Sequence, residues 1–83
     1  MRIPQKDDIY RHFKGNKYII VDIAENCTND INDERDYVVY KRLLDDKLFI
    51  RTLSEFTSEV DHERYPDVKQ KYRFQYICNT NDD

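Results

Sequence analysis

The only glycine of this 83-residue chain lies within residues 10–18, a stretch rich in basic and aromatic side chains. Gly15 or Asn16 can adopt the positive φ that a short hairpin loop needs, because neither suffers the full Cβ penalty. The residues just before the loop, His12 and Phe13, suit a pleated surface. The stretch therefore predicts a strand, a tight turn and a second strand.

The same stretch carries three basic residues and no acidic one. Its polar side chains are Arg11, His12, Lys14 and Lys17. If these side chains form a cationic rim around aromatic rings, the rim would suit an anionic ligand that contains a nucleotide-type base. The alternative is that the aromatic residues belong to the core and the basic residues are solvated hairpin positions. The sequence leaves both readings open.

Composition describes one small domain with a thin core. Hydrophobic residues make up 39% of the chain and charged residues 37%, and aromatic side chains supply much of the area that can be buried. A homodimer that buries more surface is therefore expected. The net charge of −3 does not favour nucleic acid, and residues 22–36 carry six acids and one arginine. A compact anionic ligand is favoured over extended DNA or RNA.

Two cysteines, Cys27 and Cys78, stand far apart without the spacing of a metal site. No signal peptide and no apolar run of membrane length is visible, so we expect a cytoplasmic protein with reduced cysteines and no membrane contact, although a disulfide between them stays open. The acidic segment from Glu25 to Asp36 lacks the ligand spacing and central glycine of an EF-hand. We therefore expect no metal and no cofactor.

Short apolar or alternating runs predict five strands: two around the Gly15 turn, then Tyr37–Leu44, Leu48–Leu53 and Tyr72–Ile77. Thr52 followed by Glu55 three residues later is a capping-box pattern for one helical turn. The predicted fold is mainly β, a small antiparallel, strongly bent SH3-like barrel with one short helical turn. The domain is expected over residues 9–78, with polar tails at 1–8 and 79–83.

Strict alternation selects the core face of each predicted strand. In the second strand one face is wholly apolar, and we expect it to point inward. The predicted core is Ile19, Val21, Ile23, Val39, Ile50, Leu53, Phe56 and Phe74. In the last strand the aromatic residues share one face, and they are Tyr72, Phe74 and Tyr76.

The motif Tyr-Arg-His-Phe-Lys-Gly at residues 10–15 resembles domain-of-unknown-function family 1653, which comprises small bacterial and phage domains. The rest of the resemblance follows in order through Tyr18, Ala24, Val38-Val39-Tyr40, Leu43, Phe49-Ile50-Arg51, Leu53, Phe56 and Arg73-Phe74, and covers roughly residues 9–77. The family usually has a proline where this chain has Thr52. The resemblance implies the fold and the domain boundaries more than an activity.

A non-enzymatic binding domain is the function that we favour from the sequence, with a nucleotide or a nucleotide-derived signal as its ligand. A small phage protein that sequesters such a signal would suit this profile. The predicted ligand-binding residues are Tyr10, Arg11, His12, Lys14, Tyr40 and Arg51. Arg51 is expected to be exposed and to contribute little to the stability of the fold.

Two other classes of function stay open. One is a protein-interaction module that binds a short peptide across the aromatic stripe of the last strand. The other is a small hydrolase acting on a nucleotide-type substrate. No carboxylate lies near His12 in the sequence to orient it as a general base, so we assign no catalytic residue.

Overall fold

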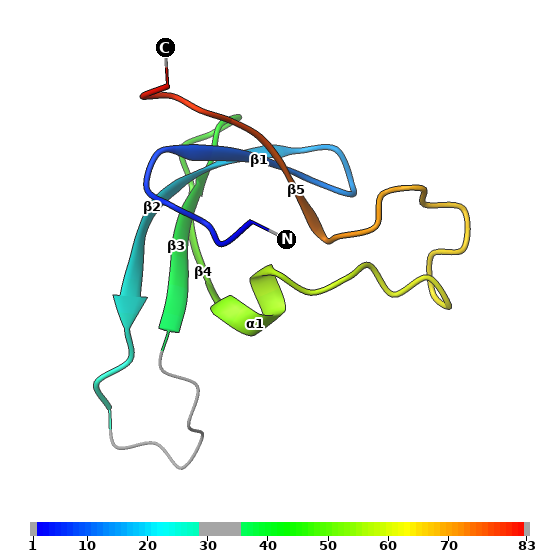
Figure 1. Ribbon diagram of the computed structural model, residues 1–83, viewed down its shortest axis with the longest axis horizontal. Helices are drawn as coiled ribbons and strands as arrows, with labels where there is room; N and C mark the ends of the chain where they lie inside the picture. Colours follow the sequence, from blue (N-terminus) through cyan, green and yellow to red (C-terminus); the bar gives the residue numbers. More distant parts are fainter. Residues whose placement is uncertain (1, 29–35, 83) are drawn as a thin grey trace.

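A computed structural model describes residues 2–28 and 36–82. The chain forms one antiparallel sheet of five strands in the order β4-β3-β2-β1-β5 and one short helix (Figure 1). The elements are β1 (Asp8–His12), β2 (Lys17–Glu25), β3 (Asp36–Arg42), β4 (Leu48–Thr52), α1 (Leu53–Phe56) and β5 (Phe74–Asn79). The prediction of a mainly β domain with one helical turn is confirmed.

The sheet is open, with β4 and β5 as its two edge strands. Closure into a barrel, as predicted, would require these edges to pair, and no such pairing occurs among the described residues. In Figure 1 the sheet bends sharply, and α1 lies in the hollow of the bend. Phe56 of α1 stacks on Phe74 of β5, with ring centroids 4.1 Å apart, so side-chain packing connects the two ends of the sheet without backbone pairing.

A β-bulge in β2 produces the bend. The pairing of β2 with β3 shifts register between Ile20 and Asp22, so Val21 is left without a partner in the ladder. A bulge bends its strand and reverses which residues face inward beyond it. Ile20 is therefore buried before the bulge, whereas Ile23 packs against the core after it.

The bulge and the neighbouring strands make the predicted core face partly wrong. The buried hydrophobic residues are Tyr10, Tyr18, Ile20, Val38, Tyr40, Phe56, Val60 and Phe74. Of the predicted core, Phe56 and Phe74 are buried, and Ile23 and Leu53 pack against the buried cluster, which confirms those four positions. The other strands turn the opposite face inward, so Ile19 and Val39 are only half-buried, and Val21 and Ile50 are exposed.

The tyrosine-bearing faces are inside because their rings form one network of edge-to-face contacts. Tyr40 lies within 5.3 Å, centroid to centroid, of both Tyr18 and Phe56. Such pairs add to the stabilisation that comes from the buried area of each ring. The alternative face offers smaller aliphatic side chains, so the aromatic face gives the larger core.

Local turn chemistry follows the sequence closely. Gly15 has a φ of +112°, and the loop closes with the Gly15 N–H donating to the carbonyl of His12 at 2.8 Å. Thr52 is the N-cap of α1, and its hydroxyl accepts from the N–H of Glu55 at 3.3 Å. The predicted turn and the predicted cap are both confirmed.

The segments predicted as polar tails are joined to each other through Asp8, which is fully buried. Its carboxylate accepts two hydrogen bonds from the Arg2 guanidinium at 3.0 Å, one from the backbone N–H of Gln5 at 2.9 Å and one from the Asn79 amide at 2.9 Å. Thr80 adds a backbone hydrogen bond to Asp7. These contacts fix the N-terminal arm below the sheet.

Candidate functional site

One hollow of the described surface, a cavity of about 340 Å³, is lined mainly by polar and charged residues, and we call it the His12 pocket. It forms where the β1–β2 turn, the end of β4 and the long connection between α1 and β5 meet. Its lining residues are His12, Phe13, Lys14, Arg51, Asp61, Arg64, Tyr65 and Arg73. Four of the eight are permanently cationic.

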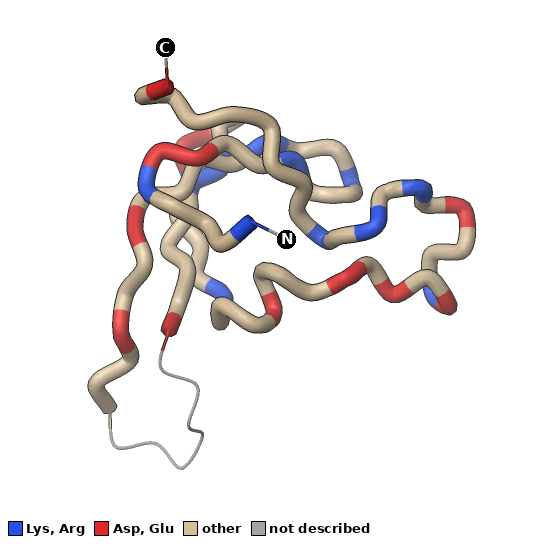
Figure 2. The backbone as a smooth tube through the Cα atoms, in the orientation of Figure 1, with Lys and Arg blue, Asp and Glu red and all other residues tan. Residues whose placement is uncertain are grey.

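Acidic and basic residues are separated along the connection between α1 and β5. In Figure 2 the segment that leaves α1 is mainly acidic, and the segment that leads into β5 is mainly basic. The two segments run side by side, since the N–H of Val60 donates to the carbonyl of Lys71 and Glu59 pairs with Tyr72. This arrangement keeps the basic side of the connection close to the β1–β2 turn.

His12 is held in one orientation within the pocket. Its Nδ1 accepts from the backbone N–H of Lys14 at 3.1 Å, and its ring stacks on Phe13 at 4.4 Å. Burial, with the nearby cations Arg51, Arg73 and Lys14, lowers the pKa of His12 to about 4. At neutral pH the imidazole is therefore uncharged, and because Nδ1 is an acceptor its proton is on Nε2. His12 thus offers a neutral N–H donor.

Arg51 is fixed at the edge of the core. Its Nε donates to the Tyr40 hydroxyl at 2.8 Å, and its Nη1 contacts Glu55 Oε1 at 3.2 Å. The same Glu55 oxygen lies 3.8 Å from Arg73 Nη1. Glu55 therefore holds two guanidinium groups close together beside the pocket.

Several ring faces accompany these cations. Phe13 and Tyr65 meet edge to face at 5.0 Å, and Lys14 Nζ lies 5.6 Å above the Tyr65 ring. The Arg64 guanidinium lies 5.5 Å above the same ring. One more donor is unused, because Arg73 Nε is buried without a hydrogen-bond partner in the described part of the chain.

The structure brings together three of the six predicted ligand-binding residues, namely His12, Lys14 and Arg51. Arg11 is exposed on β1 beside Lys17 of β2 and does not line the pocket. Tyr10 and Tyr40 are only 4% and 3% exposed, so their rings belong to the core and do not offer the stacking face that was expected. Arg51 itself is also less exposed than expected, with 27% of its side chain accessible.

Five members of the pocket were missed: Phe13 at the β1–β2 turn, and four residues of the long connection, Asp61, Arg64, Tyr65 and Arg73. Composition alone reads that segment as a polar loop. One signal was available, because Tyr65 is the only Phe, Trp or Tyr between residues 61 and 71 and is preceded by an arginine.

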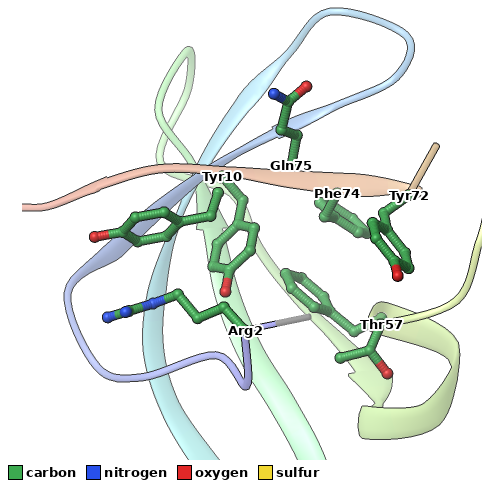
Figure 3. Close-up of a pocket in the computed structure, with 8 residues that line it drawn as sticks. Arg2, Tyr10, Thr57, Tyr72, Phe74 and Gln75 are labelled. Atoms are coloured by element: carbon green, nitrogen blue, oxygen red, sulfur yellow. The ribbon is translucent and has the colours of Figure 1, made fainter. Parts of the chain in front are cut away.

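A second, more apolar hollow of about 210 Å³ lies between β5, α1 and the N-terminal arm (Figure 3). We call it the aromatic pocket; it is lined by Arg2, Tyr10, Phe56, Thr57, Tyr72, Phe74, Gln75 and Tyr76. It contains the whole predicted aromatic stripe of the last strand. The Arg2 guanidinium lies 4.2 Å above the Tyr76 ring, and the Tyr10 hydroxyl has no hydrogen-bond partner among the described residues.

Other predicted features are placed as follows. Cys27 and Cys78 are free, exposed thiols. The acidic segment Glu25–Asp36 falls mainly on residues 29–35, which lie outside the described residues. Within residues 2–28 and 36–82, no three side chains of the His, Cys, Asp or Glu type gather as a metal-binding group, and no helix is both long and apolar enough to cross a membrane.

Fold and pocket together define a small domain built on an open, bent antiparallel sheet, with a cationic and aromatic pocket at one end. Residues 8–76 match the family described as "Protein of unknown function (DUF1653)", and the chain belongs to this family. The resemblance found in the sequence is thereby confirmed. No curated protein and no solved structure matches the chain significantly.

Proposed function

We propose that the protein is a non-enzymatic binding domain that takes a compact anionic ligand, such as a nucleotide or a nucleotide-derived signal, in the His12 pocket. The observation that carries this proposal is the excess of cations in a protein of net charge −3. Four permanent cations line the pocket, whereas Asp61 and the adjoining Glu55 are the acidic groups in contact with this set. A local positive field in an acidic protein favours an anion of small size.

The anionic group would bind between the two guanidinium groups. Arg51 and Arg73 are already held together by Glu55, so little side-chain entropy remains to be lost when they meet a ligand. A guanidinium donates two parallel hydrogen bonds to a phosphate, and His12 Nε2–H can add a third. These three donors suit a phosphate better than a carboxylate because a phosphate offers more acceptor oxygens.

The remaining part of the ligand would lie against Phe13 and Tyr65. Their rings supply flat faces on which a base can stack. The cavity volume of about 340 Å³ falls at the lower end of the range of about 300–1,000 Å³ that is usual for small-molecule sites. This size supports a single nucleotide-like molecule over an extended strand of DNA or RNA.

A domain that binds such a ligand without converting it would sequester it. The proposal therefore includes a sequestering role in the cytoplasm, which would be the host cytoplasm for a phage-encoded protein. This part rests on analogy and on the resemblance, while the ligand class rests on the pocket. Native mass spectrometry of the freshly purified protein would report any small anion that co-purifies with it.

Isothermal titration calorimetry with adenosine monophosphate and diphosphate tests the ligand class. We expect saturable binding that Arg51→Ala and Arg73→Ala each weaken about tenfold or more, in line with the loss of a charge-assisted hydrogen bond. The matched control is Arg11→Ala, which removes an arginine outside the pocket and should leave the affinity unchanged. Equal losses for all three variants would indicate a diffuse charge effect and would contradict the site.

A second candidate is a peptide-binding module, and the aromatic pocket of Figure 3 favours it. In this reading the bent sheet functions as SH3-like domains do, with a short segment of a partner lying across Tyr72 and Tyr76. A pull-down from nucleotide-depleted lysate would support it if one protein were recovered in stoichiometric amount, and if Tyr72→Ala abolished that recovery. Recovery that depends on Arg73 instead would favour the His12 pocket.

A further inference from the structure

The outer edge of β4 has unused backbone hydrogen-bonding groups. The N–H of Arg42 donates to the carbonyl of Lys47 at 2.9 Å, and the β3–β4 pairing continues from there without a register shift. Because hydrogen-bonded and non-hydrogen-bonded pairs alternate in an antiparallel ladder, Leu48 and Ile50 belong to the non-hydrogen-bonded pairs. Their N–H and C=O groups therefore point away from β3, toward the open edge of the sheet.

The side chains of this edge are apolar and exposed. Leu48 is 62% exposed and Ile50 is 65% exposed. Beside Ile50 lies a hollow of about 290 Å³ on the outer face of the sheet, to which Val39 and Tyr37 also contribute. A large aliphatic residue in the middle of an edge strand, next to an apolar hollow, is a feature that a monomer usually avoids.

β4 is five residues long and has one charged residue, Arg51, whose guanidinium lies on the inner side over Phe74, but it lacks the other usual protections of an edge strand. Such edges are blunted by lysine, proline or a bulge at the outward-facing positions. Here the outward-facing residues Leu48, Ile50 and Thr52 carry no charge, and the strand has no bulge. The other edge strand, β5, differs, because its pairing with β1 is irregular between Ile9 and Tyr10.

We infer that two copies of this chain pair through β4, antiparallel and about a two-fold axis at Ile50. In this register Ile50 of each copy exchanges two backbone hydrogen bonds with Ile50 of the other, and Leu48 lies opposite Thr52 of the second copy. Lys47 of one copy then approaches the helical turn of the other, which carries Glu55 in its first turn. Lys47 thus comes near a carboxylate of opposite charge, which also contacts Arg51 and Arg73 of its own copy.

The two-fold arrangement closes the assembly at two copies. Each copy uses the same edge, so no free β4 edge remains and no fibre forms. The two sheets become one sheet of ten strands, and the apolar outer faces around Ile50 and Val39 become continuous. The outer edge of β4 lies apart from the lining of the His12 pocket, except through Arg51 and its partner Glu55, and the backbone pairing at Ile50 does not require the proposed ligand.

Sedimentation equilibrium of the full chain at micromolar concentration tests this pairing. We expect twice the monomer mass of 10.2 kDa for the parent and a monomer for Ile50→Lys, which places a charge at the two-fold axis. The control Leu44→Lys alters a leucine in the β3–β4 turn that is even more exposed than Ile50, and this variant should remain a dimer. A monomeric parent, or a dimer that Ile50→Lys leaves intact, would overturn the inference.

Cross-linking provides a readout that does not require Ile50→Lys to fold. In a Cys27→Ser, Cys78→Ser background, Ile50→Cys should form an intermolecular disulfide under mild oxidation. Directly opposed residues of a hydrogen-bonded pair have Cα atoms about 5.5 Å apart, within the span of a disulfide. Leu44→Cys in the same background should not cross-link. Efficient cross-linking of Leu44→Cys with none at Ile50→Cys would contradict the proposed axis.

Discussion

Arg51 Nε donates a hydrogen bond of 2.8 Å to the hydroxyl of Tyr40, whose ring is buried in the core. This bond connects the fold to the His12 pocket, because the same guanidinium faces the pocket and contacts Glu55. Because its guanidinium is hydrogen-bonded to a core residue, Arg51 is preorganised in the unliganded protein. Tyr40 therefore acts on the pocket through Arg51 and not by touching a ligand.

Tyr40→Phe tests this relationship. The variant keeps the ring and removes the acceptor of Arg51, so we expect a loss of about 1 kcal/mol in the free energy of unfolding. For a domain of this size, that loss corresponds to a fall of about 4–8 °C in melting temperature. Calorimetry should also show a several-fold weaker affinity for adenosine monophosphate. Tyr37→Phe, on the opposite face of the same strand, should change neither quantity.

Val38 and Val39 are neighbours on opposite faces of β3, so substitutions at the two positions show which face packs on the core. Val38 is fully buried, whereas Val39 is half-buried on the outer face. Val38→Asp leaves an unpaired charge in the core and should cost several kcal/mol, comparable with the whole stability of a small domain. Val39→Asp should cost far less. Urea unfolding of the two variants measures both losses in the free energy of unfolding. A larger loss for Val39→Asp would mean that the Val39 face of β3, and not the Val38 face, packs on the core.

Asp8 stabilises the N-terminal arm. Its buried carboxylate accepts four hydrogen bonds, so Asp8→Ala leaves several donors, including the Arg2 guanidinium, without their partner. We expect a loss of about 1–3 kcal/mol, the range for buried polar groups that lose a hydrogen-bond partner. Thermal unfolding measures it, with Asp67→Ala as the control, because Asp67 is exposed. A loss below about 1 kcal/mol would show that the arm adds little to the fold.

Acid should destabilise the protein in two steps. The folded-state pKa of His12, about 4, is below its ordinary value of 6.5, so between these values the unfolded chain binds a proton that the folded chain does not. The contribution of the uncharged His12 to the free energy of unfolding is therefore fully present above pH 6.5, and it is lost as the pH decreases toward 4. The contacts of Asp8 also depress the pKa of its carboxyl group, so its contribution is lost below about pH 4.

His12→Gln separates the two steps. The amide cannot titrate, so the free energy of unfolding should lose its dependence on pH between about 6.5 and 4 and keep the fall at lower pH. Chemical denaturation at a series of pH values measures both. If the parent and His12→Gln had the same slope between these values, His12 would not be held in its uncharged form.

Much of the fold could be predicted from local chemistry, because local signals act over a few residues. Gly15 supplies the positive φ of its turn and Thr52 caps α1, and both effects depend on neighbours within four positions. Strand positions followed in the same way from β-branched and aromatic runs. These features needed no knowledge of distant contacts.

The faces of the strands could not be predicted by alternation, because the bulge at Val21 leaves no mark in the sequence. Ile20 and Ile23 both pack toward the core, although strict alternation places them on opposite faces. The choice of an all-aliphatic core face also undervalued tyrosine. A tyrosine ring fills a core well when its hydroxyl lies at the edge, as Tyr40 does beside Arg51.

The half of the candidate site that lies in the connection between α1 and β5 could not be predicted, because it also depends on contacts between distant residues. The long connection returns to the β1–β2 turn through contacts between residues about fifty positions apart, such as Phe13 with Tyr65. The Gln70 amide donates to the carbonyls of Arg11 and Tyr72, which fixes that return. A single tyrosine in a polar segment marks a residue that could pack on the domain but does not indicate where it will dock, so the place of Arg64 and Tyr65 in the pocket could be found only from the structure.

Nuclear magnetic resonance with adenosine monophosphate can show whether the His12 pocket binds a compact anion. We expect the side-chain signals of Arg51, Arg73 and His12 to shift along one saturable curve. The pKa of His12 should rise as the phosphate replaces water beside it. The Nε signal of Arg11 should stay in place. Shifts that centre on Arg11, or no saturable shift with millimolar adenosine monophosphate or diphosphate, would contradict the account.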